Sequence, residues 1–209
     1  NDVGDFEALK LSIETFQPEI IFHLAAQPLV IRSYQNPIET FSTNVMGTLN
    51  VLEAVRACKS VKAIVVITTD KVYENNEQEF GYVETDNLGG HDPYSASKAC
   101  AEIVTQSYTR SYFNPDNQDT LVASVRAGNV IGGGDWAKFR LIPDIIRAVV
   151  NEQTLEIRYP KSTRPWQHVL DCLYGYLLLG EKLLEGKKEY SGSWNFGPVA
   201  NMHISVQEI

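Results

Sequence analysis

The sequence lacks a long apolar run and an excess of positive charge. No stretch approaches the ~18–20 apolar residues of a membrane-spanning helix, and the first residues show no signal-peptide pattern. We therefore expect a cytoplasmic protein without a membrane partner. The formal net charge of −8 argues against a nucleic-acid-binding protein. It also means that local cations must hold any anionic ligand.

Cysteine is scarce, and metal-ligand patterns are absent. The three cysteines, Cys58, Cys100 and Cys172, lie in apolar contexts without ligand spacing, which predicts free thiols in a reducing compartment. No cluster of His, Cys and carboxylate residues supports a metal site. His23 and His168 also lie in apolar contexts, and we expect both to be buried core histidines.

What the sequence does contain is an alternation of strand-like and helix-like segments. Continuous apolar runs predict buried strands at Glu19–Ala26, Val61–Thr68 and Leu121–Val130. Helical spacing predicts helices at Asn44–Lys59 and from Tyr94 to about Phe113. The alternation predicts an α/β fold with βαβ units, a parallel sheet and right-handed crossovers.

Beyond Asn129 the composition of the sequence changes. The glycine-rich segment 131–135 precedes a predicted helix at 141–151, a short strand near 155–159 and a helix at about 169–185. We expect this half to form a small lobe that covers a ligand and partly returns to the sheet.

Three short segments fall at the carboxyl ends of the predicted strands. They are Ala25-Ala26-Gln27, Thr69-Asp70-Lys71 and Gly128-Asn129. Ligands of open α/β sheets bind beyond the carboxyl ends of the strands. The sequence therefore predicts that these segments meet at one crevice.

A tyrosine and a lysine open the predicted helix that follows Asp92-Pro93, a favoured N-cap and first helical residue. Tyr94 and Lys98 are four residues apart and share one helix face. A nearby ammonium contributes about 3 kcal/mol toward ionising a phenol, which lowers its pKa by about two units. A second positive charge is needed for a base at neutral pH. Taken alone, the pair also fits a solvated helix face.

Seven stretches together give the chain a specific resemblance. It resembles extended short-chain dehydrogenase/reductases that act on nucleotide sugars and, within them, the CDP-glucose 4,6-dehydratases. The stretches are Pro18–Val30, Thr40–Val55, Thr68–Asn75, Asp92–Cys100, Val125–Ala137, Arg140–Ala148 and Arg164–Asp171.

The resemblance implies a Rossmann-type doubly wound parallel sheet with a small α/β substrate-binding lobe. Residues 1–130 would form a truncated NAD-binding domain. Residues 131–209 would form mainly the lobe, with about 167–186 returning to the first domain. The resemblance also implies a homodimer or a higher homo-oligomer, formed through the helices at 44–59 and 94–113.

The implied activity is NAD-dependent conversion of CDP-glucose to CDP-4-keto-6-deoxyglucose and water, a step of deoxysugar biosynthesis for lipopolysaccharide O-antigen. Tyr94 would remove the proton of the C4 hydroxyl, aided by Thr69, and Lys98 would lower the pKa of Tyr94. Asp70 would be the acid that elimination of the C6 hydroxyl requires. Lys71 occupies the position of a base for the C5 proton, and can act only if partly neutral.

The resemblance also implies binding residues. Lys98 would anchor the nicotinamide ribose, and the other cofactor-binding positions would be Asp2, Val3, Ala25, Ala26, Gln27 and Tyr94. Asn129, Arg140 and Arg164 would contact the substrate diphosphate, because an arginine fork suits phosphate. In so acidic a chain the two arginines fit structural ion pairs as well.

The main departure from this family is a missing glycine-rich phosphate loop. The family begins with a strand, a G-x-G-x-x-G loop and a helix that hold the cofactor pyrophosphate. This sequence starts later, at Asn1, and reads as a fragment. We expect it to bind NAD poorly, to be inactive alone and to be frayed at Asp2-Val3. The run Gly132–Gly134 fits a turn.

Two other functions stay open on the sequence. One is a different nucleotide-sugar enzyme of this scaffold, such as a 4-epimerase or a dTDP- or GDP-sugar dehydratase. The presence of Asp70 argues against the epimerase, which needs no acid at C6. The other is a non-catalytic NAD-binding protein, which the intact Tyr94 and Lys98 disfavour.

Overall fold

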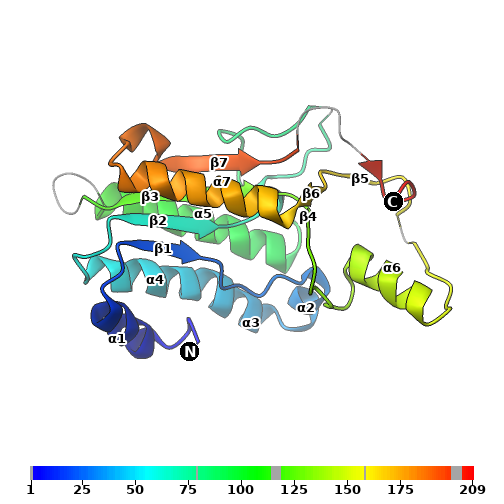
Figure 1. Cartoon of the computed structure of the whole chain (residues 1–209), viewed down its shortest axis with the longest axis horizontal. Helices are drawn as coiled ribbons and strands as arrows, with labels where there is room; N and C mark the ends of the chain where they lie inside the picture. The colour runs from blue at the N-terminus through cyan, green and yellow to red at the C-terminus, as the bar shows by residue number, and fades with distance from the viewer. Residues whose placement is uncertain (1, 79, 114–118, 158, 199–203) are drawn as a thin grey trace.

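A parallel sheet forms the centre of the computed structural model, which describes residues 2–78, 80–113, 119–157, 159–198 and 204–209. Its four strands lie in the order β1-β2-β3-β7 (Figure 1). They are β1 (Ile20–His23), β2 (Ala63–Ile67), β3 (Leu121–Ala127) and β7 (Gly192–Phe196). The three predicted strands are confirmed with shorter bounds, whereas β7 was not predicted.

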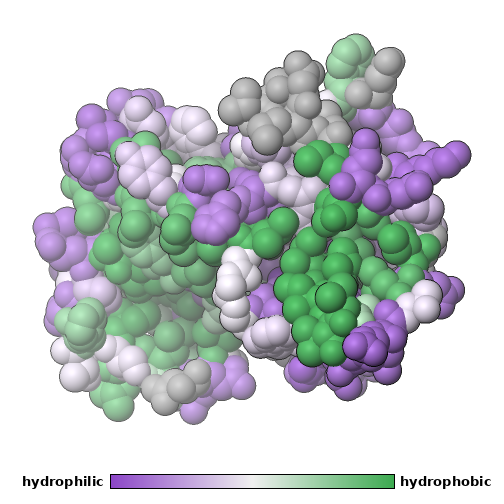
Figure 2. Space-filling model, turned by 45° about the vertical axis from the view of Figure 1, so that its right-hand side comes forward, coloured by the Kyte–Doolittle hydropathy of each residue, from purple (hydrophilic) through white to green (hydrophobic). Residues whose placement is uncertain are grey.

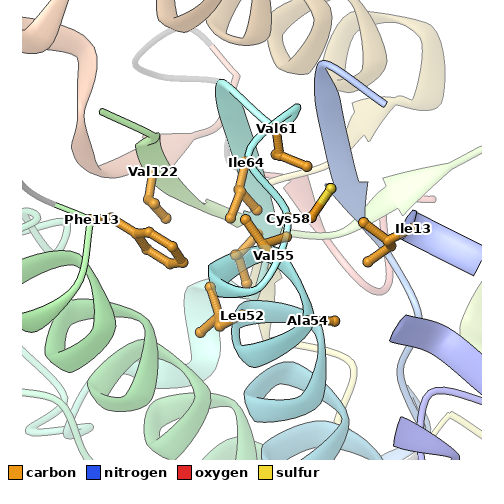
Figure 3. Packing of buried hydrophobic residues seen from close by; sticks show 10 residues of the cluster. Ile13, Leu52, Ala54, Val55, Cys58, Val61, Ile64, Phe113 and Val122 are labelled. Atoms are coloured by element: carbon orange, nitrogen blue, oxygen red, sulfur yellow. The ribbon is translucent and has the colours of Figure 1, made fainter. Parts of the chain in front are cut away.

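One face of the sheet is covered by three helices, α1 (Phe6–Phe16), α4 (Gly47–Arg56) and α5 (Pro93–Ser111). Figure 3 shows side chains from α1 and α4, together with Phe113 just after α5, meeting those of the strands in one buried cluster. The fully buried Leu52 and Val55 come from α4, and Ile64 comes from β2. Alternate strand residues point to this face because side chains of a strand alternate.

The other face is covered by α7 (Val169–Leu184), which lies in front of the sheet in Figure 1. Helices therefore cover both faces, which confirms the predicted doubly wound α/β fold. The strands β1, β2, β3 and β7 succeed one another in a single direction across the sheet. Because α7 lies opposite α4 and α5, the crossover from β3 to β7 has the other hand. The expectation of uniformly right-handed crossovers is wrong here.

In the segment predicted as a helix at Asn44–Lys59, helical structure begins before Asn44 and ends before Lys59. It is preceded by α2 (Val30–Gln35) and α3 (Pro37–Phe41), and the π-helix η1 (Ser42–Met46) leads into α4. Pro37 occupies the first turn of α3, where a missing N–H costs nothing.

The region after β3 is less regular. It contains β4 (Val130–Ile131), α6 (Leu141–Val150), β5 (Thr163–Arg164), β6 (Gln167–His168), η3 (Lys188–Tyr190) and β8 (Ile204–Ser205). β4 pairs with β6 in parallel, and β5 pairs with β8 antiparallel. The strand predicted near 155–159 is wrong. The described residues of that segment have no strand partner, and residue 158 lies outside the description.

α6 lies to one side of the sheet (Figure 1). Figure 2, in which this side is turned forward, shows apolar residues gathered on the surface there. Val149 and Val150 of α6 are among the exposed apolar residues of the protein. Among the described residues, no helix is both long and apolar enough to cross a membrane.

The two histidines differ. His23 is buried at the end of β1, and its Nε2 lies 3.0 Å from Thr48 Oγ1, which confirms the expected core position. The same expectation is wrong for His168, which is exposed and caps α7 by accepting a hydrogen bond from Leu170 N at 3.2 Å. Apolar neighbours in the sequence therefore do not show whether a histidine is buried in the core or caps a helix.

Candidate active site

The carboxyl end of β2 leads directly into the first part of the site. Thr69 is extended, and the short 3₁₀-helix η2 (Asp70–Val72) follows it. The Thr69 hydroxyl donates to Asp70 Oδ1 at 3.1 Å and accepts from Lys71 N at 3.4 Å. This local turn holds the Asp70 carboxyl at the carboxyl edge of the sheet.

The beginning of α5 provides the second part. Asp92 caps the helix, as predicted, by accepting from Ser95 N at 3.0 Å and from Ser95 Oγ at 2.5 Å. Tyr94 is 8% exposed and Lys98 is 5% exposed. The alternative of a solvated helix face is therefore wrong.

The electrostatics of Tyr94 differ from the expectation. Burial raises the pKa of Tyr94, and this effect is opposed by the Thr69 hydroxyl and by the charge of Arg140. Lys98 is not among the causes of this shift: its Nζ donates to Ile67 O at 3.0 Å. Burial lowers the pKa of Lys98 itself to about 8, against a raising effect of Glu102. The expected lowering of the Tyr94 pKa by Lys98 is therefore not found.

Asp70 is partly buried in a crevice near two cations. Burial raises the pKa of the Asp70 carboxyl, while the charges of Lys71 and Arg164 lower it. Gly128 lies against it, because a Cβ on Gly128 would stand 3.3 Å from Asp70 Oδ2. A raised pKa favours the protonated form of this carboxyl over that of an exposed aspartate.

A cavity of about 850 Å³ opens beside Asp70. Four of the predicted residues line it: Asp70, Lys71, Asn129 and Arg164. Residues that the sequence did not single out also line it, among them Tyr73, Gln78, His91, Pro165 and Asn195.

The two arginines are placed differently. Arg164 lies on β5, and its Nη1 donates to Thr163 O at 2.7 Å. Arg140 is not among the residues lining the cavity, and it forms an ion pair with Asp135 at 3.1 Å. Arg140 thus takes part in a structural ion pair, although its charge still acts on Tyr94.

The predicted cofactor segment after β1 is fixed to the α5 side of the sheet. Ala25 and Ala26 follow β1, and Gln27 is buried. Gln27 N donates to Asn44 Oδ1 at 2.8 Å, and Gln27 Nε2 donates to Thr40 Oγ1 at 2.9 Å. The amide of Asn44 in turn donates to Ser97 Oγ at 2.9 Å. This chain of hydrogen bonds joins the segment to α5.

The predicted cofactor residues Asp2 and Val3 are held against α4. Asn50 Nδ2 donates to Val3 O at 2.8 Å, and Gly4 N donates to Asp2 Oδ1 at 2.8 Å. Val3 also packs closely on Gly47, where a Cβ would stand 2.7 Å from Val3 Cγ2. The expectation that Asp2-Val3 is frayed is wrong.

Sequence reasoning missed a buried polar network beneath the site. Glu102 and Arg126 form an ion pair at 3.0 Å, and both side chains are essentially inaccessible to solvent. The signal available was position: Glu102 follows Lys98 by one helical turn, on a face that carries Tyr94. Among the described residues, no group of His, Cys and carboxylate side chains is arranged to hold a metal ion.

Comparison with known proteins gives a consistent group of relatives. The profile described as "NAD dependent epimerase/dehydratase family" matches residues 1–197. A CDP-glucose 4,6-dehydratase of Salmonella typhimurium is 56% identical over 200 residues, covering 94% of this chain and 56% of that protein. The chain thus spans little more than half the length of this relative.

Solved structures show the same fold. A dTDP-glucose 4,6-dehydratase of Streptomyces venezuelae with NAD bound superposes with a TM-score of 0.84 at 25% identity, covering 100% of this chain and 59% of that one. A UDP-glucose 4-epimerase of Thermotoga maritima has a TM-score of 0.84 at 22% identity. The match covers 100% of this chain and 64% of that one. At that identity the second likeness concerns the fold alone.

Proposed function

Because the chain belongs to the NAD-dependent epimerase/dehydratase family, we propose that it is the catalytic part of a nucleotide-sugar 4,6-dehydratase that uses NAD and acts on CDP-glucose. The 56% identity to a CDP-glucose 4,6-dehydratase supports this choice within the family. We also propose the division into residues 1–130 and 131–209, with 167–186 returning to the first part, and a homo-oligomeric state.

The described residues fit a nicotinamide cofactor at the Tyr94–Lys98 turn. An ammonium has three donors, and Ile67 O takes one from Lys98, which leaves two for the hydroxyl groups of a ribose. When bound, the cofactor supplies hydride transfer, removing hydride from C4 of the hexose and returning it to C6. Asp2, Val3, Ala25, Ala26 and Gln27 are proposed to line the rest of its position.

Three side chains move protons in the proposed reaction. Tyr94 Oη accepts the proton of the C4 hydroxyl, which Thr69 Oγ1 positions. Lys71 Nζ, in its amine form, takes the C5 proton and returns it to C5 when hydride reaches C6. Asp70 gives its proton to the C6 hydroxyl, which leaves as water, and solvent carries the proton held by Tyr94 back to Asp70. The water lost therefore corresponds in sum to the C6 hydroxyl and the proton of the C4 hydroxyl.

The cations near the cavity are proposed to hold the substrate diphosphate. Arg164 and Asn129 line the cavity together with Asp70. Arg140 is proposed as a further contact, reached by exchanging its ion pair with Asp135 for a phosphate oxygen. Such local cations are needed because the chain carries a net charge of −8.

One observation carries the choice of a dehydratase over an epimerase. The Asp70 carboxyl lines the cavity, where it is partly buried, and this burial raises its pKa. Elimination of a hydroxyl group needs an acid there, whereas inversion at C4 does not.

The test is incubation of the full-length protein with NAD and CDP-glucose, followed by NMR analysis of the sugar. We expect a 4-keto-6-deoxy sugar with no net formation of NADH. CDP-galactose as the product would establish an epimerase instead. Faster turnover of dTDP-glucose or UDP-glucose would show that this nucleotide sugar, and not CDP-glucose, is the substrate. NAD binding with no turnover would indicate a non-catalytic protein. Tyr94→Phe serves as the inactive control.

A further inference from the structure

Glu102 is a carboxylate that the proposed reaction does not use, although it follows Tyr94 and Lys98 on the same helix. It is located on α5 and is 0% exposed. Its Oε1 accepts a hydrogen bond from Thr68 Oγ1 at 2.6 Å. Its Oε2 accepts from Ser124 Oγ at 2.7 Å and from Arg126 Nη2 at 3.0 Å. A third hydroxyl, Ser193 Oγ, donates to Oε2 at 3.2 Å.

These donors come from three neighbouring strands or their ends. Thr68 follows β2, Ser124 and Arg126 belong to β3, and Ser193 belongs to β7. A single carboxylate therefore fixes α5 to the carboxyl half of the sheet. Charge-assisted hydrogen bonds of this kind are about twice as strong as neutral ones.

The position of Glu102 relative to the reacting groups is specific. Tyr94, Lys98 and Glu102 follow one another at intervals of four residues and are all buried. The donor to Oε1, Thr68, is the residue before Thr69. Lys98 Nζ donates to Ile67 O, one residue earlier again. Glu102 Oε1 and Lys98 Nζ thus bind neighbouring residues, Thr68 and Ile67, at the end of β2, whereas Oε2 binds Arg126.

We propose that Glu102 is a positioning residue that keeps Lys98 in its ammonium form and holds it against the strand end that carries Thr69 and Asp70. This inference rests on the proposed function only for its consequence in catalysis. An amine in place of the ammonium has one donor fewer for the hydroxyl groups of a ribose.

The charged groups around Lys98 support this assignment. Burial lowers the pKa of Lys98, and the Glu102 carboxylate raises it. His23 at the end of β1 faces Lys98 as well, and its pKa is lowered by burial and by the Lys98 charge, so it is neutral at neutral pH. Tyr94 on the same helix is neutral when its pKa is raised. Among the groups in the described chain that face Lys98, the Glu102 carboxylate thus supplies the compensating negative charge.

The experiment is an NMR titration of the Lys98 ¹⁵Nζ resonance in the full-length protein labelled at lysine, assigned by its loss in Lys98→Arg. Glu102→Gln is expected to shift the Lys98 midpoint down by about one pH unit, a tenfold change in the ammonium-to-amine ratio. The matched control is Glu53→Gln, which removes a partly exposed carboxylate paired with Arg56 and is expected to leave the midpoint unchanged.

Glu102→Gln leaves Arg126 buried without a counter-charge, so a second variant guards against loss of folding. Glu102→Gln/Arg126→Met removes both charges and is expected to fold and still show the lowered midpoint. The pH profile of C4 oxidation should move in parallel. An unchanged Lys98 midpoint in either folded variant would overturn the proposal, and so would failure of both variants to fold. Because the titration needs no substrate, its result stands apart from the test of the dehydratase activity.

Discussion

The Asp70 carboxyl packs against the backbone of Gly128 so closely that a Cβ there would stand 3.3 Å from Oδ2. The same Cβ would stand 2.6 Å from Cγ of Pro165, whose ring cannot rotate away. Gly128→Ala should therefore displace the cavity wall and lower kcat by about 100-fold, since shifts near 1 Å cost that much in catalysis. Steady-state kinetics on the full-length protein measures this. Gly133→Ala is the control, because no atom lies within 4 Å of its Cβ, and it should keep wild-type kcat.

The acid role of Asp70 separates two partial reactions. Asp70→Asn removes the proton donor and should slow elimination by about 10²- to 10⁴-fold while C4 oxidation continues. Reduced cofactor would then accumulate and absorb at the wavelength of NADH, which the wild type does not show. Equal slowing of oxidation and elimination would count against an acid at this position.

The buried amide of Asn44 is predicted to matter for stability. Asn44 accepts from Gln27 N at 2.8 Å and donates to Gln27 O at 3.1 Å and Ser97 Oγ at 2.9 Å. Asn44→Ala would leave these buried groups unpaired, which should cost about 2–4 kcal/mol of unfolding free energy. Urea denaturation measures the loss. Asn50→Ala, which removes only the bonds to the exposed Val3–Gly4 segment, should cost less than about 1 kcal/mol.

His23 should make stability depend on pH. Burial, and secondarily the charge of Lys98, lower its pKa from 6.5 to about 4. The unfolded chain then binds a proton more readily than the folded one. The contribution is therefore complete above about pH 6.5 and is lost as the pH falls toward 4, amounting to about 3 kcal/mol.

Denaturant midpoints between pH 7 and pH 4 test this dependence. His23→Gln should flatten the profile over that interval, whatever its effect on absolute stability. An identical slope in His23→Gln and in wild type would contradict the prediction.

The sheet and the site loops could be predicted from the sequence because they depend on local patterns. Continuous apolar runs marked β1, β2 and β3, and the segments after them contain Thr69, Asp70 and Asn129. The Asp92 cap likewise fixed the start of α5. The roles of these side chains in catalysis remain proposals.

The rest depends on pairing between distant segments. β7 is short, starts at Gly192 and pairs with β3 across the whole irregular region, so no local run marks it. The Glu102–Arg126 pair joins a helix to a strand. The position of Glu102, one turn after Lys98, indicates a buried side chain but does not identify Arg126 as its partner. Helical spacing placed Tyr94 and Lys98 on one face. It could not show that the flexible lysine stem carries its ammonium to Ile67 O.

The pairing of β4 with β6 has a mechanical consequence. The chain leaves the sheet at β4 and returns at β6, and the two strands run parallel side by side, with Val130 opposite Gln167. The region between them, including α6 and Arg164, is held by this pair of strands and also by the pairing of β5 with β8. A displacement of Arg164 relative to Asp70 would therefore strain both pairings at the same time.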